Sequence, residues 1–308
     1  MYKDGLNQEE KDHLSLEEWE KVLSKLPKHT IIDITGAEPI AYSNFIPFTR
    51  LLKKLGLRYS ITTNGTLYNK DTADELVKNG LQVLMVSLDG LEDTHNKLRG
   101  NSKAFSRTME FLKRIEEAKK KYNSKTPLIN IKSTVLDENH TELVPLMNFC
   151  HSKINVDVFT FTFLFQNRAR GGMELLEDFS SEEFNTGNYA EYINIEDVTK
   201  TVCEIERIKS KFPFPIVYKP RMKFADVLRY IKNPSSLNVD SCPQYKNNLT
   251  LYFNGDLAPC DIGLKVGNIR DYDYRFQKVY QSESFKSFSN EMHSGHKACQ
   301  GCCAGCHK

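Results

Sequence analysis

Residues 30–39 read TIIDITGAEP, and this stretch decides the fold. Its first half is a short run of β-branched and apolar residues, which is the pattern of a buried strand. Its second half consists of small residues followed by Glu38 and Pro39, which is the composition of a loop. Two later stretches repeat this order of strand and turn: residues 57–65 read LRYSITTNG, and residues 81–90 read LQVLMVSLDG.

Segments with apolar residues at helical spacing separate these strands. Ser15 and Glu18 have the spacing of a capping box, which marks the start of the first helix. Strands that alternate with helices of this length pair in parallel, so the sequence predicts an α/β fold with its site in the loops at the carboxyl ends of the strands. The predicted helices cover residues 15–26, 43–55, 71–79, 105–122 and 142–150, and two further strands cover residues 128–135 and 156–165.

Three side chains at these predicted strand ends have polar groups that can bind a ligand. Glu38 follows the small residues Gly36 and Ala37, which leave the backbone accessible, so its carboxylate can bind an ammonium group. Ser87 and Asp89 lie two residues apart, and a hydroxyl and a carboxylate on one side of a strand suit a ribose. An ordinary tight turn with a solvated carboxylate is the alternative for both segments.

The residues just beyond Asp89 include a histidine and an arginine. Arg99 can hold a carboxylate through two parallel hydrogen bonds, although a solvated surface arginine is the alternative. We interpret His95 as a surface or helix-capping residue, because nothing near it in the sequence completes a set of ligands. Turn chemistry is an adequate explanation of Asn64 and Gly65.

The second half of the chain changes character after the fifth predicted strand. Residues 166–192 are polar and contain glycines, so we expect a long loop there. Beyond it the pattern predicts helices at residues 195–212 and 222–231, on either side of a short strand at residues 216–219.

Six of the eight cysteines lie between residues 242 and 306. Residues 249–260 read LTLYFNGDLAPC, which predicts a hairpin that turns at Asn254-Gly255 and ends at Cys260. Four others form two C-x2-C pairs, a spacing that brings two thiolates to one metal. Thiolates without a set of histidines suit an iron–sulfur cluster or zinc, and the spacing does not decide between them. The predicted metal ligands are Cys242, Cys260, Cys299, Cys302, Cys303 and Cys306.

The composition excludes several classes of protein. Among the 308 residues, lysine plus arginine number 42 and aspartate plus glutamate number 40, so no general basic surface is present for nucleic acid. No stretch of about 18 apolar residues is present to cross a membrane, and the first residues lack the apolar core of an export signal. We therefore expect a cytoplasmic protein whose cysteines are reduced.

The order of these segments resembles that of the radical S-adenosylmethionine (SAM) enzymes with a C-terminal SPASM or twitch domain. TGAEP, then TTNG, then SLDG followed by His95 and Arg99, and then the cysteine-rich end match the family over nearly the whole chain. The resemblance implies a partial (βα)6 TIM-like barrel missing its first strand, plus a small C-terminal cysteine-rich α+β domain. It implies a barrel core at residues 1–166, a loop and helical connection at residues 167–237, and an iron–sulfur domain at residues 238–308.

The resemblance also implies roles for single residues. Glu38 and the backbone around it would hold the amino group of SAM, Ser87 and Asp89 would hold its ribose, and Arg99 would hold its carboxylate. The second glycine of the family's loop is Ala37 here. One auxiliary 4Fe–4S cluster would be bound by Cys242, Cys260 and two of the last four cysteines, with two clusters as the alternative. The complete set implied to bind SAM is Gly36, Ala37, Glu38, Pro39, Asn64, Ser87, Asp89 and Arg99.

Members of this family also carry a C-x3-C-x2-C loop ahead of the first helix. It binds a further 4Fe–4S cluster that reduces SAM, and the resulting 5′-deoxyadenosyl radical takes a hydrogen atom from the substrate. No cysteine precedes Cys150 here, so we expect that the first residues of a longer enzyme are missing and that the 308-residue chain alone does not cleave SAM.

The implied function is that of a radical SAM oxidoreductase, or a maturase of a peptide or cofactor. Its partners would be a peptide or small-molecule substrate and an electron donor such as flavodoxin or ferredoxin, with no nucleic acid and no membrane. The alternative is a degenerate, non-catalytic relative that binds SAM or structural zinc.

Overall fold

The computed structural model describes residues 12–163, 193–219, 223–233, 246, 248–260 and 264–293. These residues form two compact units. The large unit contains residues 27–163, 193–219 and 223–232, and the small unit contains residues 12–26, 233, 246, 248–260 and 264–293. The first helix, which the sequence grouped with the barrel core, therefore lies in the small unit with the C-terminal residues.

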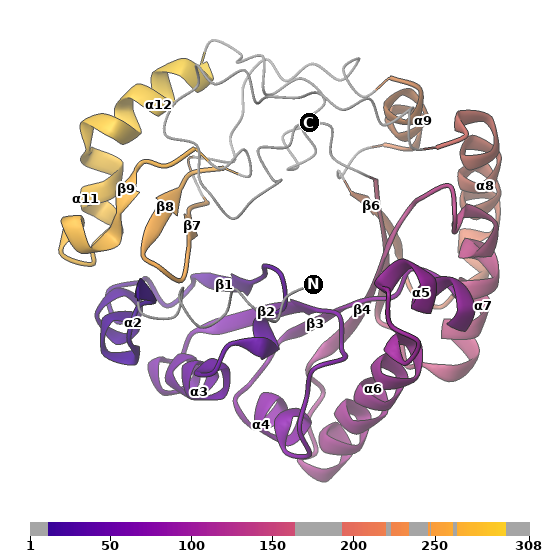
Figure 1. The fold of residues 1–308 in the computed structure, drawn as a ribbon, viewed down its shortest axis with the longest axis horizontal. Coiled ribbons are helices and arrows are strands. Elements are labelled where there is room, and N and C mark those ends of the chain that lie inside the picture. The colour runs from indigo at the N-terminus through magenta and orange to yellow at the C-terminus, as the bar shows by residue number, and fades with distance from the viewer. Residues whose placement is uncertain are drawn as a thin grey trace. The chain divides into compact units, whose positions relative to one another are not determined.

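A six-stranded parallel sheet forms the centre of the large unit, and its strands are in chain order (Figure 1). Each neighbouring pair is parallel, as the alternation of helices and strands in the sequence predicts. The α/β fold class is confirmed. The strands are β1 (Ile31–Ile34), β2 (Arg58–Thr63), β3 (Val83–Ser87), β4 (Leu128–Thr134), β5 (Val158–Thr162) and β6 (Ile216–Lys219).

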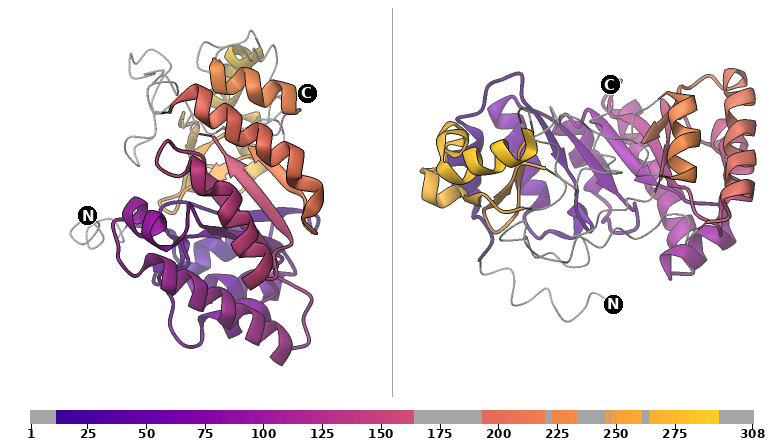
Figure 2. Two further views of the ribbon diagram at one scale, coloured as in Figure 1. Left: turned by 90° about the vertical axis from the view of Figure 1, so that its right-hand side faces the viewer. Right: turned by 90° about the horizontal axis from the view of Figure 1, so that it is seen from above.

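Helices cover one side of this sheet. In Figure 1, α3, α4, α6, α7 and α8 lie along that side, and α8 and α9 pack side by side, as the left view of Figure 2 also shows. The α-helices of the unit are α3 (Phe45–Leu55), α4 (Thr72–Lys78), α5 (Glu92–Arg99), α6 (Ala104–Lys121), α7 (Leu143–Lys153), α8 (Ile195–Ile208) and α9 (Phe224–Lys232). Three short 3-10 helices join them: η2 (Pro39–Ala41), η3 (His140–Glu142) and η5 (Lys209–Lys211).

The core of the large unit lies between the sheet and these helices. Tyr59 donates a hydrogen bond to the carbonyl of Leu76 in α4 (3.5 Å), which identifies the helix-covered face of β2. The residues of β2 to β5 that share this face include Ile61, Leu84, Ile131 and Phe159, all fully buried. Burial of each such side chain stabilises the fold by about 1.5–3 kcal/mol.

Helix α5 is not predicted by the sequence analysis. It contains few apolar residues, and its N-terminal residue Leu91 offers no side-chain cap. The carboxylate of Glu142 provides the cap from outside, because it accepts hydrogen bonds from the Leu91 amide (2.9 Å) and the Thr94 hydroxyl (2.8 Å). A cap supplied by a residue 51 positions further along the chain leaves no local sequence signal.

An antiparallel three-stranded sheet forms the centre of the small unit, in the order β7-β8-β9. The predicted hairpin is confirmed: Gly255 adopts a positive φ of 94° between β7 and β8, which an L-residue rarely tolerates. The elements are α2 (Leu16–Leu23), β7 (Thr250–Leu251), β8 (Asp256–Ala258), β9 (Gly267–Asn268), η7 (Ile269–Tyr272), α11 (Phe276–Gln281) and α12 (Glu283–His293).

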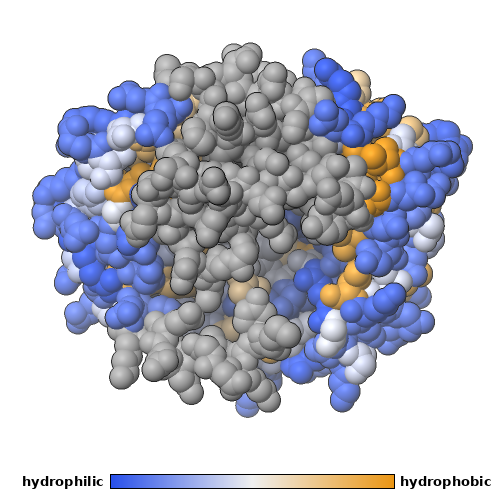
Figure 3. Space-filling model, turned by 45° about the horizontal axis from the view of Figure 1, so that its top comes forward, coloured by the Kyte–Doolittle hydropathy of each residue, from blue (hydrophilic) through white to orange (hydrophobic). Residues whose placement is uncertain are grey.

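The surface of the described residues is largely polar. The face shown in Figure 3 carries mostly hydrophilic side chains, with hydrophobic ones confined to small patches. Among the described helices, none has the length and apolar character needed to cross a bilayer.

Candidate functional site

The loop after β1 exposes its backbone at the carboxyl edge of the sheet. Thr35, Gly36 and Ala37 are all exposed. Gly36 has a φ of 148°, a conformation that L-residues rarely adopt, and a Cβ built on it would meet open space. Glycine is therefore needed here for the backbone conformation and not for lack of room. Pro39, the last residue of the predicted set in this loop, is buried as the first residue of η2.

Glu38 is held in place by three hydrogen bonds. Its Oε1 accepts from the hydroxyl of Thr63 (2.7 Å) and the amide of Ile40 (3.1 Å), and its Oε2 accepts from the amide of Asn64 (2.8 Å). Burial raises the pKa of Glu38 above its ordinary value, and these hydrogen bonds oppose that rise. A carboxylate has about four acceptor positions, so one position on Oε2 remains for a donor of a ligand.

Asn64 stabilises the turn after β2. Its side-chain oxygen accepts from the amide of Thr66 (2.8 Å) and from the hydroxyl of the same residue (2.6 Å). Its backbone amide donates to Glu38, as described above, and its carbonyl accepts from Thr108 in α6 (2.8 Å). Asn64 therefore positions Glu38 through its backbone, while its side chain holds the turn.

Asp89 and Arg99 are brought together by the structure. Strand β3 ends at Ser87, which is half-buried, and Asp89 lies beyond the strand and is 5% exposed. One carboxylate oxygen of Asp89 forms an ion pair with Arg99, and the other accepts from the amide of Thr134 (2.9 Å). The side chain of Arg99 is 32% exposed, so solvent reaches it, and the buried Asp89 orients its guanidinium through the ion pair.

His95 is fully buried, so the interpretation as a surface residue is wrong. Its Nδ1 accepts a hydrogen bond from the Asp89 amide (3.1 Å), which places the proton of the neutral ring on Nε2. Burial lowers the pKa of His95 to about 4, so the ring is neutral at physiological pH. Helix α5 carries both His95 and Arg99 and places them against Asp89, just beyond the end of β3. The sequence spacing did not reveal these contacts.

Asn139 is a positioning residue that the sequence analysis missed. It is fully buried, and its side-chain amide donates to the carbonyls of Asp89 (2.6 Å) and Thr134 (2.7 Å). It therefore joins the loops after β3 and β4. The one signal in the sequence is the polar run of residues 137–140 after a strand, which is typical of a turn.

The predicted SAM-binding residues thus follow three adjacent strands. Gly36, Ala37, Glu38 and Pro39 follow β1, Asn64 follows β2, and Ser87 ends β3 with Asp89 just beyond it. Because the three strands are neighbours and parallel, these residues share one edge of the sheet. Arg99 joins them through its ion pair with Asp89.

Cys260 lies in the small unit, two residues after the end of β8, and is half-buried. The other five predicted metal ligands, Cys242, Cys299, Cys302, Cys303 and Cys306, lie outside the described residues. Cys150 lies in α7 of the large unit, where burial raises the pKa of its thiol to about 12 and keeps it protonated. The thiol chemistry of Cys150 is therefore that of a core residue.

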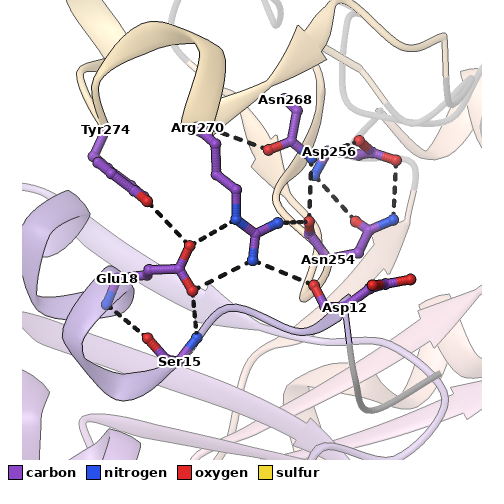
Figure 4. Close-up of polar contacts among 8 residues, drawn as sticks. All are labelled: Asp12, Ser15, Glu18, Asn254, Asp256, Asn268, Arg270 and Tyr274. Carbon is purple, nitrogen blue, oxygen red and sulfur yellow. Dashed lines mark hydrogen bonds and ion pairs between the residues drawn. The ribbon is translucent and has the colours of Figure 1, made fainter. Parts of the chain in front are cut away.

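The hairpin that leads to Cys260 is held to helix α2 of the same unit (Figure 4). The Nε of Arg270 lies 2.6 Å from Oε1 of Glu18. The same guanidinium also donates from Nη1 to the carbonyl of Asn254 in the hairpin turn (2.7 Å). Tyr274 donates a further hydrogen bond to Glu18 (3.1 Å). The predicted capping box is confirmed, because Glu18 also accepts from the Ser15 amide.

Two family models match the chain. The radical SAM superfamily matches residues 3–150, and an iron–sulfur cluster-binding domain, SPASM, matches residues 242–307. The first match covers the strands and loops that carry the candidate SAM site, and the second covers all six of the clustered cysteines.

Several known proteins are similar in sequence. The sporulation killing factor maturation protein SkfB of Bacillus subtilis is 27% identical over 152 residues, which are 49% of this chain and 35% of SkfB. An AdoMet-dependent heme synthase of Oleidesulfovibrio alaskensis is 23% identical over 307 residues, which cover 95% of this chain and 74% of that protein. The chain thus spans about a third of the length of SkfB.

The fold is similar to that of SuiB from Streptococcus suis. Its crystal structure superimposes with a TM-score of 0.63 at 15% sequence identity, over 90% of this chain and 62% of SuiB. At this level of identity the similarity supports the fold assignment alone.

Proposed function

Because residues 3–150 belong to the radical SAM superfamily and residues 242–307 to the SPASM family of iron–sulfur cluster-binding domains, we propose that this protein is an iron–sulfur oxidoreductase that matures a peptide or a small cofactor. These families bind SAM and 4Fe–4S clusters. When bound, SAM and a reduced cluster supply one-electron chemistry that removes a hydrogen atom from a substrate. The contribution of the chain is to bind, orient and shield these groups.

The observation that carries the proposal is the remaining acceptor position of Glu38. Three donors of the protein fix this carboxylate, and the exposed backbone of residues 35–37 lies next to it in the chain. The amino group of SAM is an ammonium, which suits a fixed carboxylate and neighbouring carbonyl groups. Because Glu38 is already oriented, binding of the ammonium requires little loss of side-chain entropy.

Arg99 and Ser87 would make two further contacts with SAM. Arg99 is oriented by Asp89 and remains partly exposed, so its guanidinium is available to the carboxylate of SAM. Ser87 is half-buried at the end of β3, and its hydroxyl is available to the ribose. Asp89 then acts through Arg99, because its own oxygens already bind Arg99 and Thr134.

Cys260 and the remaining clustered cysteines would hold an auxiliary 4Fe–4S cluster. Soft thiolate ligands are the donors that iron–sulfur clusters use, and six of them lie within residues 242–306. An iron–sulfur protein with so many thiols is suited to the reducing cytosol, and its electron donor would be a flavodoxin or ferredoxin. The names of the relatives, a peptide maturation protein and a heme synthase, support a peptide or small-molecule substrate.

Substitution Glu38→Gln tests the proposal through SAM binding, measured by equilibrium dialysis with labelled SAM. The change keeps the shape of the side chain and removes its charge, so we expect affinity to fall at least about tenfold. Glu110→Gln is the control, because it makes the same change of charge on the surface of α6, where Glu110 pairs with Arg114. Equal SAM affinity of Glu38→Gln and the unmodified protein would contradict the proposal.

A further inference from the structure

Positive side chains gather on the small unit around the turn between η7 and α11. The ammonium groups of Lys21, in α2, and Lys25, just after it, lie over the ring of Tyr274, 5.5 and 5.7 Å from its centroid. Lys25 also donates a hydrogen bond to the backbone carbonyl of Asp273 (2.6 Å). We define the cationic patch as four exposed side chains: Lys21, Lys25, Arg275 and Lys278.

The pKa of Lys25 reflects this gathering of like charges. Burial lowers the pKa below the ordinary value for lysine, and so does the charge of Arg275. Lys21 and Lys278 act in the same direction, whereas the carboxylate of Asp273 opposes them. Neighbouring like charges disfavour the charged form of a group, so the folded chain maintains the patch against electrostatic repulsion.

Nearby acidic side chains leave the patch positive. Glu18 is held by Arg270, which is not a member of the patch (Figure 4). Asp273 pairs with Lys278. In the described part of the chain, no other acidic side chain forms an ion pair with a member of the patch. The exposed guanidinium of Arg275 is therefore available to a partner.

The turn that carries the Tyr274 ring has a strained backbone. Asp273 and Tyr274 have positive φ angles of 52° and 57°, and neither residue is glycine. A left-handed conformation is unfavourable for an L-residue, and a bulky one rarely adopts it. The Tyr274 amide donates to the carbonyl of Ile269 (3.1 Å), which closes the turn. Strain of this kind persists mainly where it has a function, and here it places the ring under two lysines.

Attachment of helix α2 explains only part of this arrangement. The hydroxyl of Tyr274 binds Glu18 (3.1 Å) and Lys25 binds the turn, so both side chains hold the helix. The side chain of Arg275 makes no hydrogen bond or ion pair with any residue that the structure describes, and its charge adds to the repulsion. A cation that is unfavourable within the chain is suited to an acidic partner outside it.

The patch suits an acidic protein better than a nucleic acid. Binding to a nucleic acid commonly involves about 6–10 phosphate contacts, and four cations are too few for that. Weak complexes between electron-transfer proteins bury less than about 1,200 Å², and opposite charges steer the partners together. Tyrosine and arginine, both present here, are enriched at protein interfaces.

We propose that the cationic patch docks an acidic one-electron carrier, such as a flavodoxin or a ferredoxin. This inference rests on the proposed function, because one-electron chemistry needs such a partner. It goes further by assigning the carrier to a surface of the small unit, the unit that also contains Cys260. Complementary charge on the carrier would speed its encounter with this surface.

Binding of a purified acidic flavodoxin and a purified acidic ferredoxin to the 308-residue protein tests the inference without an activity assay. Affinity is measured by biolayer interferometry at about 10 mM and about 150 mM salt, because the screening length shortens from about 30 Å to about 8 Å over this range. We expect at least one carrier to bind, with an affinity at least about tenfold higher at the lower salt concentration.

Substitutions of Arg275 make the test specific to the patch. Arg275→Glu reverses one exposed charge, and we expect the affinity for the carrier to fall at least about fivefold. Arg275→Gln removes the charge without adding a negative one, so its effect should be in the same direction and smaller. Arg207→Glu is the matched control, because Arg207 is also exposed, on α8 of the large unit, and forms no ion pair among the described residues.

Three results would overturn the inference: no binding of either carrier at the lower salt concentration, equal affinity in Arg275→Glu and Arg207→Glu, or displacement of the carrier by polyuridylate RNA. The last would assign the patch to a nucleic acid. The outcome is separable from that of the proposed function, because the Glu38→Gln test reads SAM affinity and this one reads carrier binding. Carrier binding that depends on Arg275, together with unchanged SAM affinity in Glu38→Gln, would leave the docking surface standing and reject the proposed role of Glu38.

Discussion

Arg270 Nε lies 2.6 Å from Glu18 Oε1, although the two residues are 252 positions apart in the chain. The same guanidinium donates to the backbone of the turn between β7 and β8, so one side chain joins helix α2 to the hairpin that precedes Cys260. The backbone adds to this connection, because the amide of Leu14 donates to the carbonyl of Phe253 (2.6 Å). Helix α2 is thus a structural part of the small unit.

Substitution Glu18→Gln is expected to destabilise the small unit by about 1–2 kcal/mol, since hydrogen bonds to charged groups contribute more than neutral ones but this pair is partly exposed. The hydrogen bond from Arg270 lowers the pKa of Glu18 from 4.5 to about 2. A carboxylate with a lowered pKa stabilises the fold above its ordinary pKa, and this contribution is lost as the pH falls from about 4.5 to about 2. Hydrogen exchange of residues 12–26 and 248–274 at several pH values measures both effects.

Glu17→Gln is the matched control, because Glu17 is exposed in the same first turn of α2 and the charge change is identical. If the difference in stability between the two variants stays constant from pH 5 to pH 2.5, Glu18 is not held by Arg270.

Gly36→Ala is expected to weaken SAM binding, because alanine rarely adopts the φ of 148° found there. The strained conformation costs about 1–3 kcal/mol, and the loop would relieve the strain by moving the backbone next to Glu38. Gly56→Ala, at the end of α3, introduces strain of about 1–2 kcal/mol at an equally open left-handed position. Equilibrium dialysis and thermal unfolding separate the two: both variants should lose stability, and only Gly36→Ala should lose affinity. Equal loss of SAM affinity in both variants would mean that the geometry of the loop at Gly36 does not matter for SAM binding.

His95→Asn is expected to retain SAM affinity, whereas His95→Leu should lower it, because asparagine offers an oxygen at the position of Nδ1 to accept from the Asp89 amide. Loss of this acceptor would release the loop that holds Asp89 and, through it, Arg99. Equal affinity in the asparagine and leucine variants would exclude a positioning role.

The same histidine predicts a pH dependence of stability. Burial lowers the pKa of His95 from 6.5 to about 4, so the unfolded chain takes up its proton at a higher pH than the folded chain. The resulting stabilisation is present above pH 6.5 and is lost as the pH falls towards 4, by up to about 1.4 kcal/mol per pH unit. Thermal unfolding of the unmodified protein and His95→Asn should therefore differ in slope between pH 6.5 and 4. His140→Asn is the control within the same unit, and a parallel slope for His95→Asn and the unmodified protein would contradict the prediction.

Cys260→Ser is expected to lower the iron and sulfide content of protein reconstituted under reducing conditions, because a serine hydroxyl is a poorer ligand than a thiolate. Cys150→Ser is the control, since the thiol of Cys150 is buried and protonated. Metal analysis and the visible spectrum report the result. Stoichiometric zinc without colour in the unmodified protein, or equal iron in both variants, would contradict an iron–sulfur role for Cys260.

The elements of the fold follow largely from local sequence. The capping box of Ser15 and Glu18 was predicted and is present. The helix predicted at residues 43–55 ends as α3 at Leu55, and Gly56 follows it with a left-handed φ of 67°. Apolar periodicity places the ends of all six strands of the large unit within three residues. It did not reveal α5, whose cap comes from Glu142 and whose face has few apolar residues.

The sequence by itself determined which residue types lie at the carboxyl ends of the strands, because strand, turn and helix each depend on neighbours a few positions away. Only the tertiary structure decided what these residues do to one another: Thr63 and Asn64 fix Glu38, Asp89 and Arg99 form an ion pair, and Arg270 holds Glu18. The physical reason is that hydrogen bonds and ion pairs act over about 3 Å in space, and sequence periodicity carries no information about which distant segments come that close.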